Sequence, residues 1–146
     1  MDWPCSTSIG KEAALPLEMR LPVASDTDVV LARERGRKIA AEAGFSRADQ
    51  CLIATAISEV ARNIVQYAGR GQIQLSILQD KPRGLLVIAS DEGPGIADLK
   101  LALQDGYSTG GGLGLGLPGA KRLMDEFEIV SEVGKGTTIT MKKWVF

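Results

Sequence analysis

The spacing of apolar and polar residues changes several times along the chain, and each change predicts a new element. Residues 17–23 alternate between the two classes, as a half-buried strand does. Residues 26–43 carry apolar side chains at helical spacing. Asp26 or Asp28 can cap the start of this helix, and Gly44 can end it. The first part of the chain therefore predicts a strand followed by a helix.

A second helical pattern follows, with a broader apolar stripe that predicts deeper burial. Ser46 and Asp49 resemble a capping box at its start, and Gly69 marks its end. The rest of the chain predicts a strand hairpin, a third helix and two further strands joined by a glycine turn, over residues 72–78, 85–89, 118–127, 127–133 and 137–144.

Together these elements predict an α+β fold. We expect a two-layer α/β sandwich, in which three main helices cover one face of a mixed, mostly antiparallel sheet. At 146 residues, with 45% hydrophobic and 24% charged residues, the chain has the size and composition of one globular domain. We expect residues 17–146 to form this domain, and the poorly patterned residues 1–16 to be a flexible extension.

Charge and cysteine content narrow the choice of partners and compartment. The net charge is −1 and both signs are interspersed, so nothing indicates nucleic acid or an anionic membrane as a partner. Cys5 and Cys51 lack the spacing of a disulfide framework or a metal site. No apolar stretch has transmembrane length, and residues 1–10 do not resemble a signal peptide. We therefore expect a cytoplasmic protein.

The chain contains no histidine, and this absence excludes several chemistries. A Ser-His-Asp or Cys-His nucleophile pair, a histidine zinc ligand and a phospho-acceptor histidine cannot come from this chain. Any acid–base catalysis must therefore fall to a carboxylate.

Glu59 and Asn63 lie four residues apart on the second predicted helix and therefore share a face, with Arg62 beside them. Mg²⁺ prefers oxygen ligands and keeps several waters, so the Asn63 oxygen together with substrate phosphates is a sufficient ligand set. Glu59 could then accept the proton of an attacking hydroxyl or water. Taken alone, the pair is more typical of an ordinary solvated helix face, because such polar pairs are common.

Asp91 stands at the end of a predicted strand, directly before a turn that contains Gly93 and Gly95. A carboxylate in this position can accept the exocyclic N–H of adenine, and the glycines allow the backbone to lie against the base. The alternative for this segment alone is an ordinary Asp-Gly-Pro-Gly turn.

Residues 110–116 form a glycine-rich run at the start of the third predicted helix. Backbone N–H groups at a helix start favour anions, so phosphate is the expected ligand. Residues 114–119 also match a dinucleotide-binding glycine pattern, but no apolar strand precedes them and no βαβ unit surrounds them. Phosphate binding and a flexible hinge remain the alternatives for this run taken alone.

Four segments, taken in order, resemble a known family. Glu59-Val-Ala-Arg-Asn63, Asp91-Glu-Gly-Pro-Gly95, residues 112–116 and residues 134–138 are similar to the N, G1, G2 and G3 boxes of the GHKL ATPases. The likeness covers residues 17–146. Within that family, the sequence most resembles the small serine/threonine kinases that regulate sigma factors, the RsbT-like switch kinases of the stressosome.

The resemblance implies a GHKL (Bergerat) fold that binds ATP and Mg²⁺. It implies that Glu59 is the catalytic base or hydroxyl-orienting group and that Asn63 is both the metal ligand and a nucleotide contact. It further implies that Asp91 fixes adenine and that residues 97–111 form a lid. The remaining nucleotide-binding residues implied by the resemblance are Gly93, Gly95, Ile96, Gly112, Leu113, Gly114, Leu115, Gly116, Thr137 and Thr138.

Such kinases phosphorylate a serine or threonine on STAS-domain proteins of the RsbS and RsbR kind, and then leave that complex to activate an RsbU-like phosphatase. The resemblance therefore implies a partner-switching kinase with no nucleic-acid or membrane partner. An ATP-gated binding module of the anti-sigma type is the main alternative. Glu59 favours the kinase, because a pure binding module needs no base. An isolated ATPase domain of the gyrase or Hsp90 type would need a further domain to complete its site.

Overall fold

A computed structural model describes residues 18–96 and 116–146 of the chain. The described part contains three helices and a five-stranded sheet. Along the chain the elements are β1 (Glu18–Val23), α1 (Asp26–Ala43), α2 (Arg47–Tyr67), β2 (Gly71–Leu78), β3 (Gly84–Asp91), α4 (Gly116–Leu123), β4 (Glu126–Glu132) and β5 (Gly136–Trp144). The predicted extension over residues 1–16 and the predicted lid over residues 97–111 lie outside the described residues.

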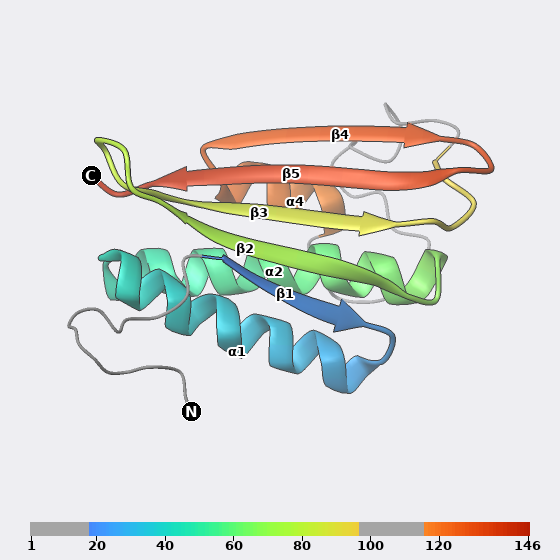
Figure 1. The fold of residues 1–146 in the computed structure, drawn as a ribbon, viewed down its shortest axis with the longest axis horizontal. Coiled ribbons are helices and arrows are strands. Elements are labelled where there is room, and N and C mark those ends of the chain that lie inside the picture. The colour runs from blue at the N-terminus through green and yellow to red at the C-terminus, as the bar shows by residue number, and fades with distance from the viewer. Residues whose placement is uncertain (1–17, 97–115) are drawn as a thin grey trace.

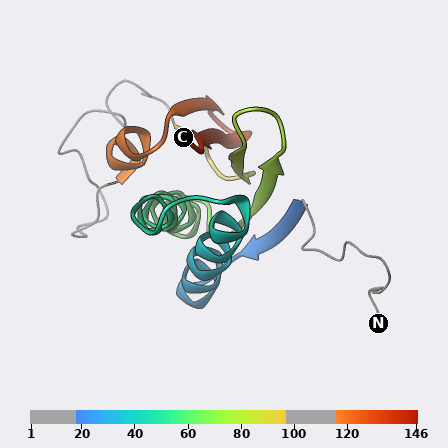
Figure 2. The same cartoon turned by 90° about the vertical axis from the view of Figure 1, so that its left-hand side faces the viewer.

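The helices lie on one side of the sheet, which confirms the predicted two-layer arrangement (Figure 1). The view turned by 90° shows α1, α2 and α4 together on that side (Figure 2). The strand order is β1-β2-β3-β5-β4, and every pair is antiparallel. The described sheet is therefore antiparallel throughout, whereas the sequence predicted a mixed, mostly antiparallel one.

The core lies between the sheet and the helices, and strand periodicity supplies the side that the sheet contributes. In β2 and β3, every second residue is buried against the helices, because successive side chains point to opposite faces. The largest fully buried side chains come from α1, α2 and the sheet, and they are Ile39, Ile53, Ile57, Ile73, Leu75, Leu85, Met141, Val23, Val60 and Val87.

Serine residues begin both long helices. The Ser46 hydroxyl accepts from the Asp49 N–H at 3.1 Å, which confirms the predicted cap of α2. The cap predicted for α1 was wrong, because Ser25 accepts from the Asp28 N–H at 3.3 Å and occupies the N-cap position. Asp28 instead accepts from the Ala24 N–H at 2.8 Å, one residue before the cap.

The third helix is shorter at its C-terminal end than the sequence predicted. The predicted helix reached residue 127, whereas α4 ends at Leu123 and β4 begins at Glu126. The Lys143 Nζ donates to the Leu123 carbonyl at 3.0 Å, and the Asp125 N–H donates to the Lys142 carbonyl at 2.9 Å. Partners on β5 therefore take up the backbone groups that a longer helix would have used itself.

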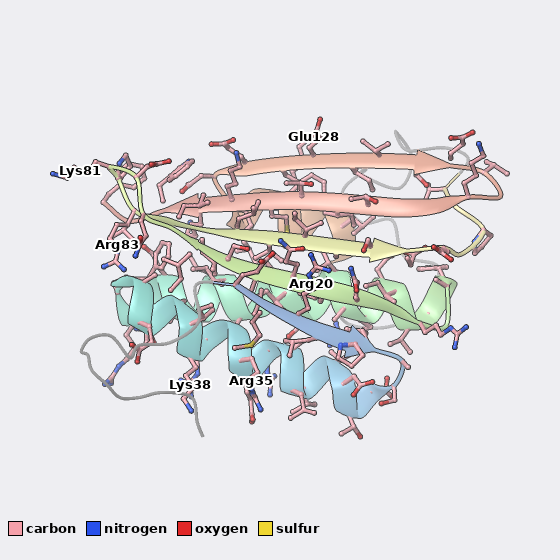
Figure 3. All side chains as sticks on the ribbon, viewed as in Figure 1. Arg20, Arg35, Lys38, Lys81, Arg83 and Glu128 are labelled. Atoms are coloured by element: carbon pink, nitrogen blue, oxygen red, sulfur yellow. The ribbon has the colours of Figure 1, made fainter. Side chains whose placement is uncertain are left out.

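Charged side chains lie around the rim and on the outer surfaces. Arg35 and Lys38 point away from the sheet on α1, and Lys81 and Arg83 lie in the β2–β3 turn (Figure 3). That turn is at the opposite end of the hairpin from Asp91, because Leu78 pairs with Gly84 and Gly71 pairs with Asp91. Within the described ranges, no helix combines the length and the apolar character needed to cross a membrane.

Candidate functional site

Two of the predicted site residues, Asp91 and Thr137, lie next to each other at one end of the sheet. The strand register places Gly71 opposite Asp91, Asp91 opposite Thr137, and Thr137 opposite Ser131. This row crosses four strands, β2, β3, β5 and β4, and the next row inward on the same face is apolar, with Ile73, Ala89, Ile139 and Ile129. Figure 1 shows the end of α2, the end of β3 and the β4–β5 turn at this same end of the molecule. The row Gly71, Asp91, Thr137 and Ser131, here called the polar row, is the boundary of the core.

Asp91 is the half-buried carboxylate of the polar row. Its Oδ1 accepts from the Gly93 N–H at 2.8 Å, which closes an Asx turn directly after β3. That bond fixes the orientation of the carboxylate. Within the described ranges, its other oxygen makes no hydrogen bond, so the group can accept from a ligand without breaking its own turn.

Gly93 and Gly95 are fixed by contacts inside the chain. A Cβ on Gly93 would lie 2.5 Å from the Ala68 Cβ at the end of α2, and a Cβ on Gly95 would lie 2.4 Å from the Glu132 carbonyl oxygen. Gly95 also has a φ of 80°, which a larger residue rarely adopts. The sequence assigned these glycines to the approach of a ligand, whereas the structure gives a packing reason for each of them.

Ser131 is a site residue that the motif analysis missed. Its hydroxyl accepts from the Ile96 N–H at 2.7 Å, lies 2.7 Å from the Thr137 hydroxyl, and donates to the Gly136 carbonyl at 3.2 Å. It therefore joins the turn after β3 to the start of β5. A polar residue at an inward position of β4, two residues after Ile129, was the signal that could have identified it.

Thr137 and Thr138 face opposite sides of β5. Thr137 is buried, with 5% of its surface exposed, and belongs to the polar row. Thr138 is exposed on the outer face, opposite Ser90 and Val130. Thr137 is therefore next to Asp91 on the helix side, and Thr138 is not.

Glu59 is buried and connects two helices. Only 8% of it is exposed, and its Oε1 accepts from the Gly116 N–H, the first residue of α4, at 3.0 Å. Its Oε2 accepts from the Arg62 Nη1 at 3.1 Å. Asn63 is half-buried one turn further along α2, so it lies on the same ridge as Glu59, as the spacing predicted.

The phosphate part of the predicted site is described only at its last residue. Gly116 begins α4 with a φ of 69°, and Gly112, Leu113, Gly114 and Leu115 lie outside the described residues. Within the described ranges, no group of three or more His, Cys, Asp or Glu side chains could hold a metal ion.

The chain was then compared with known proteins. The family model of the histidine kinase-like ATPase domain matches residues 23–143. The chain belongs to this family. The match includes α1, α2, α4, all of β2 to β4 and the polar row, so the family's shared unit is the two-layer domain described above.

Two kinds of relative are most informative about this family member. The chain is 52% identical over 124 residues to the serine/threonine-protein kinase RsbT of Bacillus subtilis, covering 84% of this chain and 93% of that protein. It is 33% identical over 99 residues to the anti-sigma F factor of Clostridium kluyveri, covering 62% of this chain and 68% of that protein.

Solved structures of the same fold are more distant in sequence. The RsbU and RsbW domains of a Mycobacterium tuberculosis protein match with a TM-score of 0.63 and 22% identity, over 90% of this chain and 33% of that one. The mycobacterial sensor histidine kinase MprB matches with a TM-score of 0.52 and 18% identity, over 86% and 97% of the two chains. At these identities the likeness supports the fold alone.

Proposed function

We propose that this family member is an ATP- and Mg²⁺-dependent serine/threonine protein kinase that works by partner switching. The observation that carries the proposal is the position of Glu59: a buried carboxylate, hydrogen-bonded to the first backbone N–H of the helix that follows the predicted phosphate loop. The relation to RsbT of Bacillus subtilis, along nearly the full length of that kinase, supports the same conclusion.

Each residue in the proposal has a role that its surroundings support. Asp91 would accept from the adenine amino group with the oxygen that its turn does not use. Glu59 would accept the proton of the attacking serine or threonine hydroxyl, and its bond to Gly116 keeps it beside the phosphate loop. Asn63 would contribute its side-chain oxygen to magnesium. When bound, ATP would supply the γ-phosphoryl group and leave as ADP, and Mg²⁺ would neutralise phosphate charge during the transfer.

The proposed substrates are STAS-domain proteins of the RsbS and RsbR kind, with an RsbU-like phosphatase as the second partner. The test is incubation of the protein with purified STAS-domain proteins and labelled Mg-ATP. We expect label on a serine or threonine of the STAS protein and no stable label on this chain. Stable label on this chain would argue against direct transfer.

Two variants separate nucleotide binding from catalysis in that assay. Asp91→Ala should abolish nucleotide binding and transfer together, because it removes the only polar-row carboxylate in the described part of the chain. Glu59→Ala should keep binding and lose transfer. A fully active Glu59→Ala would remove the role proposed for Glu59.

An ATP-gated anti-sigma binding module is the second candidate, and the likeness to an anti-sigma F factor favours it. In that case nucleotide state would select the partner and no phosphate would move. The two candidates give opposite results in the labelling assay. Nucleotide-dependent capture of a partner without label on that partner would support the second.

A further inference from the structure

Ser131 lies at the centre of the polar row's hydrogen bonds, although it lies outside the four segments that resemble the family's boxes. Its oxygen is within hydrogen-bonding distance of three groups: the Ile96 N–H at 2.7 Å, the Thr137 hydroxyl at 2.7 Å and the Gly136 carbonyl at 3.2 Å. These groups come from the turn after β3 and from the start of β5, on either side of Asp91.

The number of hydrogens decides how the three contacts coexist. A serine hydroxyl has one hydrogen to donate and two acceptor positions. The Ile96 N–H can only donate and the Gly136 carbonyl can only accept. All three contacts are hydrogen bonds at once in one arrangement alone: Ile96 and Thr137 both donate to Ser131, and Ser131 donates to Gly136.

This arrangement fixes what Thr137 can offer to a ligand. Its one hydroxyl hydrogen is used toward Ser131, so its oxygen can act toward a third group only as an acceptor. Thr137 is 5% exposed and stands directly opposite Asp91 in the β3–β5 register. Two acceptors, a carboxylate and a hydroxyl oxygen, therefore lie side by side in the polar row.

Two adjacent acceptors that face the 6-position of a purine discriminate between adenine and guanine. Adenine presents an amino group, which donates, where guanine presents a carbonyl oxygen, which accepts. A carbonyl oxygen facing two acceptors leaves polar groups without a partner, and a buried site rejects such a ligand strongly. Because the Thr137 oxygen acts as an acceptor, it adds to the preference for adenine that Asp91 alone would give.

We propose that Ser131 is a positioning residue for nucleotide selectivity: through its bonds to Thr137 and Ile96 it holds the Thr137 hydroxyl as an acceptor beside Asp91 and holds the turn after β3 in place. This inference rests on the proposed function, because it takes a purine nucleotide as the ligand. It extends that function to a residue that touches the nucleotide only through its neighbours.

Ser131→Ala removes the hydroxyl and frees the Thr137 hydrogen. The Kd for ATP should rise about tenfold, the effect of losing one hydrogen bond of ordinary strength. The Kd for GTP should change much less, because the freed Thr137 hydroxyl can turn and donate to the guanine oxygen. The ratio of the two affinities, measured by calorimetry on the full chain, is the decisive quantity. Ser131→Thr, which keeps a hydroxyl, should restore it.

A second measurement needs no nucleotide. Amide hydrogen exchange of Ile96 in the ligand-free protein should accelerate in Ser131→Ala, because its N–H loses the 2.7 Å acceptor. Ser90→Ala is the matched control: Ser90 precedes Asp91 on β3 but lies on the outer face, opposite Thr138. It should change neither the exchange rate nor the affinity ratio.

The double variant tests whether Ser131 acts through Thr137. In a Thr137→Val background, Ser131→Ala should cause no further loss of selectivity, so the two changes should not add. Equal weakening of ATP and GTP by Ser131→Ala, or no change in either, overturns the inference and leaves the proposed function intact. A wild-type chain that binds no nucleotide overturns both.

Discussion

At the scale of single residues, Glu59 combines a structural contact with the proposed chemistry. Its two oxygens accept from Gly116 and Arg62, so an alanine at this position removes two hydrogen bonds as well as a base. Glutamine keeps an oxygen that can accept from the Gly116 N–H but cannot act as a base. The two substitutions therefore separate the structural contact from the chemistry.

We predict that Glu59→Gln binds ATP within about threefold of the wild type and transfers phosphate about 10² to 10⁴ times more slowly, the usual contribution of a general base. Single-turnover transfer to a STAS-domain protein, together with ATP affinity, measures both effects. Glu59→Ala should likewise keep nucleotide binding and lose transfer, although the Gly116 N–H also loses its acceptor. Wild-type transfer by Glu59→Gln would show that Glu59 serves only to hold α4.

Asn63 should control the response to magnesium. We predict that Asn63→Ala weakens ATP binding about tenfold when Mg²⁺ is present and leaves it unchanged when the metal is chelated, because its side-chain oxygen is the proposed protein ligand. Titrating ATP with and without a chelator provides the measurement. Gln66→Ala, an exposed amide on the same helix, is the control and should bind normally in both conditions. Equal loss in both conditions would assign Asn63 to folding or to the nucleotide itself.

Glu59, Asn63 and Asp91 could be proposed from the sequence because their placement follows from local spacing: two share a helix face and the third ends a strand. It could not identify Ser131, whose contacts to Ile96 and Thr137 depend on how β4 and β5 are aligned. Register is a tertiary property, set by the core that forms on one face of the sheet.

At the scale of elements, the capped start of α2 was predictable and the end of α4 was not. Ser46 and Asp49 define the start of α2 locally, and the structure confirms that cap. The end of α4 is different, because its cap comes from a distant residue: the Lys143 side chain on β5 donates to the Leu123 carbonyl. Helical periodicity alone cannot exclude three or four more residues when a distant strand supplies the partner that ends the helix.

Lys143 should therefore matter more to stability than the lysine next to it. Its side chain is 11% exposed, and its Nζ donates to the Leu123 carbonyl at 3.0 Å and lies 3.7 Å from Asp125 Oδ1. We predict that Lys143→Met lowers the free energy of unfolding by about 1 to 3 kcal/mol, because the half-buried Leu123 carbonyl loses its donor. Urea denaturation measures this.

Lys142→Met is the matched control on the same strand. Lys142 lies on the opposite face of β5, paired with Leu86 and Glu126, and should change the unfolding free energy by less than about 0.5 kcal/mol. Equal effects of the two substitutions would mean that the contact to Leu123 does not stabilise the end of α4.

At the scale of the whole molecule, the polar row brings together residues that are far apart in the sequence. Asp91 is held by a turn on β3, Thr137 by β5 and Ser131 by β4, while Glu59 ties α2 to α4. The layered fold was predictable because alternation and helical spacing specify which faces are apolar. The strand order β1-β2-β3-β5-β4 was not, because local patterns do not say that β5 inserts between β3 and β4.

A ligand held by elements from both layers should stabilise the entire domain. Binding to the folded state alone contributes about 2.7 kcal/mol at a ligand concentration of about 100 times Kd. For a chain of this size, that corresponds to a rise in Tm of about 5 to 10 °C. We predict this rise for Mg-ATP and a much smaller one for Mg-GTP at the same concentration, measured by thermal unfolding.

Asp91→Asn tests whether the stabilisation comes through the polar row. Asparagine keeps an oxygen that can accept from the Gly93 N–H, so the turn and the Tm without nucleotide should be preserved. The charged carboxylate oxygen that would accept from the adenine amino group is lost, so Mg-ATP should raise Tm by less than about 2 °C. Thr138→Val, on the exposed face of β5, should respond to Mg-ATP as the wild type does. A full rise in Asp91→Asn would place the nucleotide away from the Asp91 carboxylate, because a ligand that this charge holds cannot keep its full stabilising effect once the charge is removed.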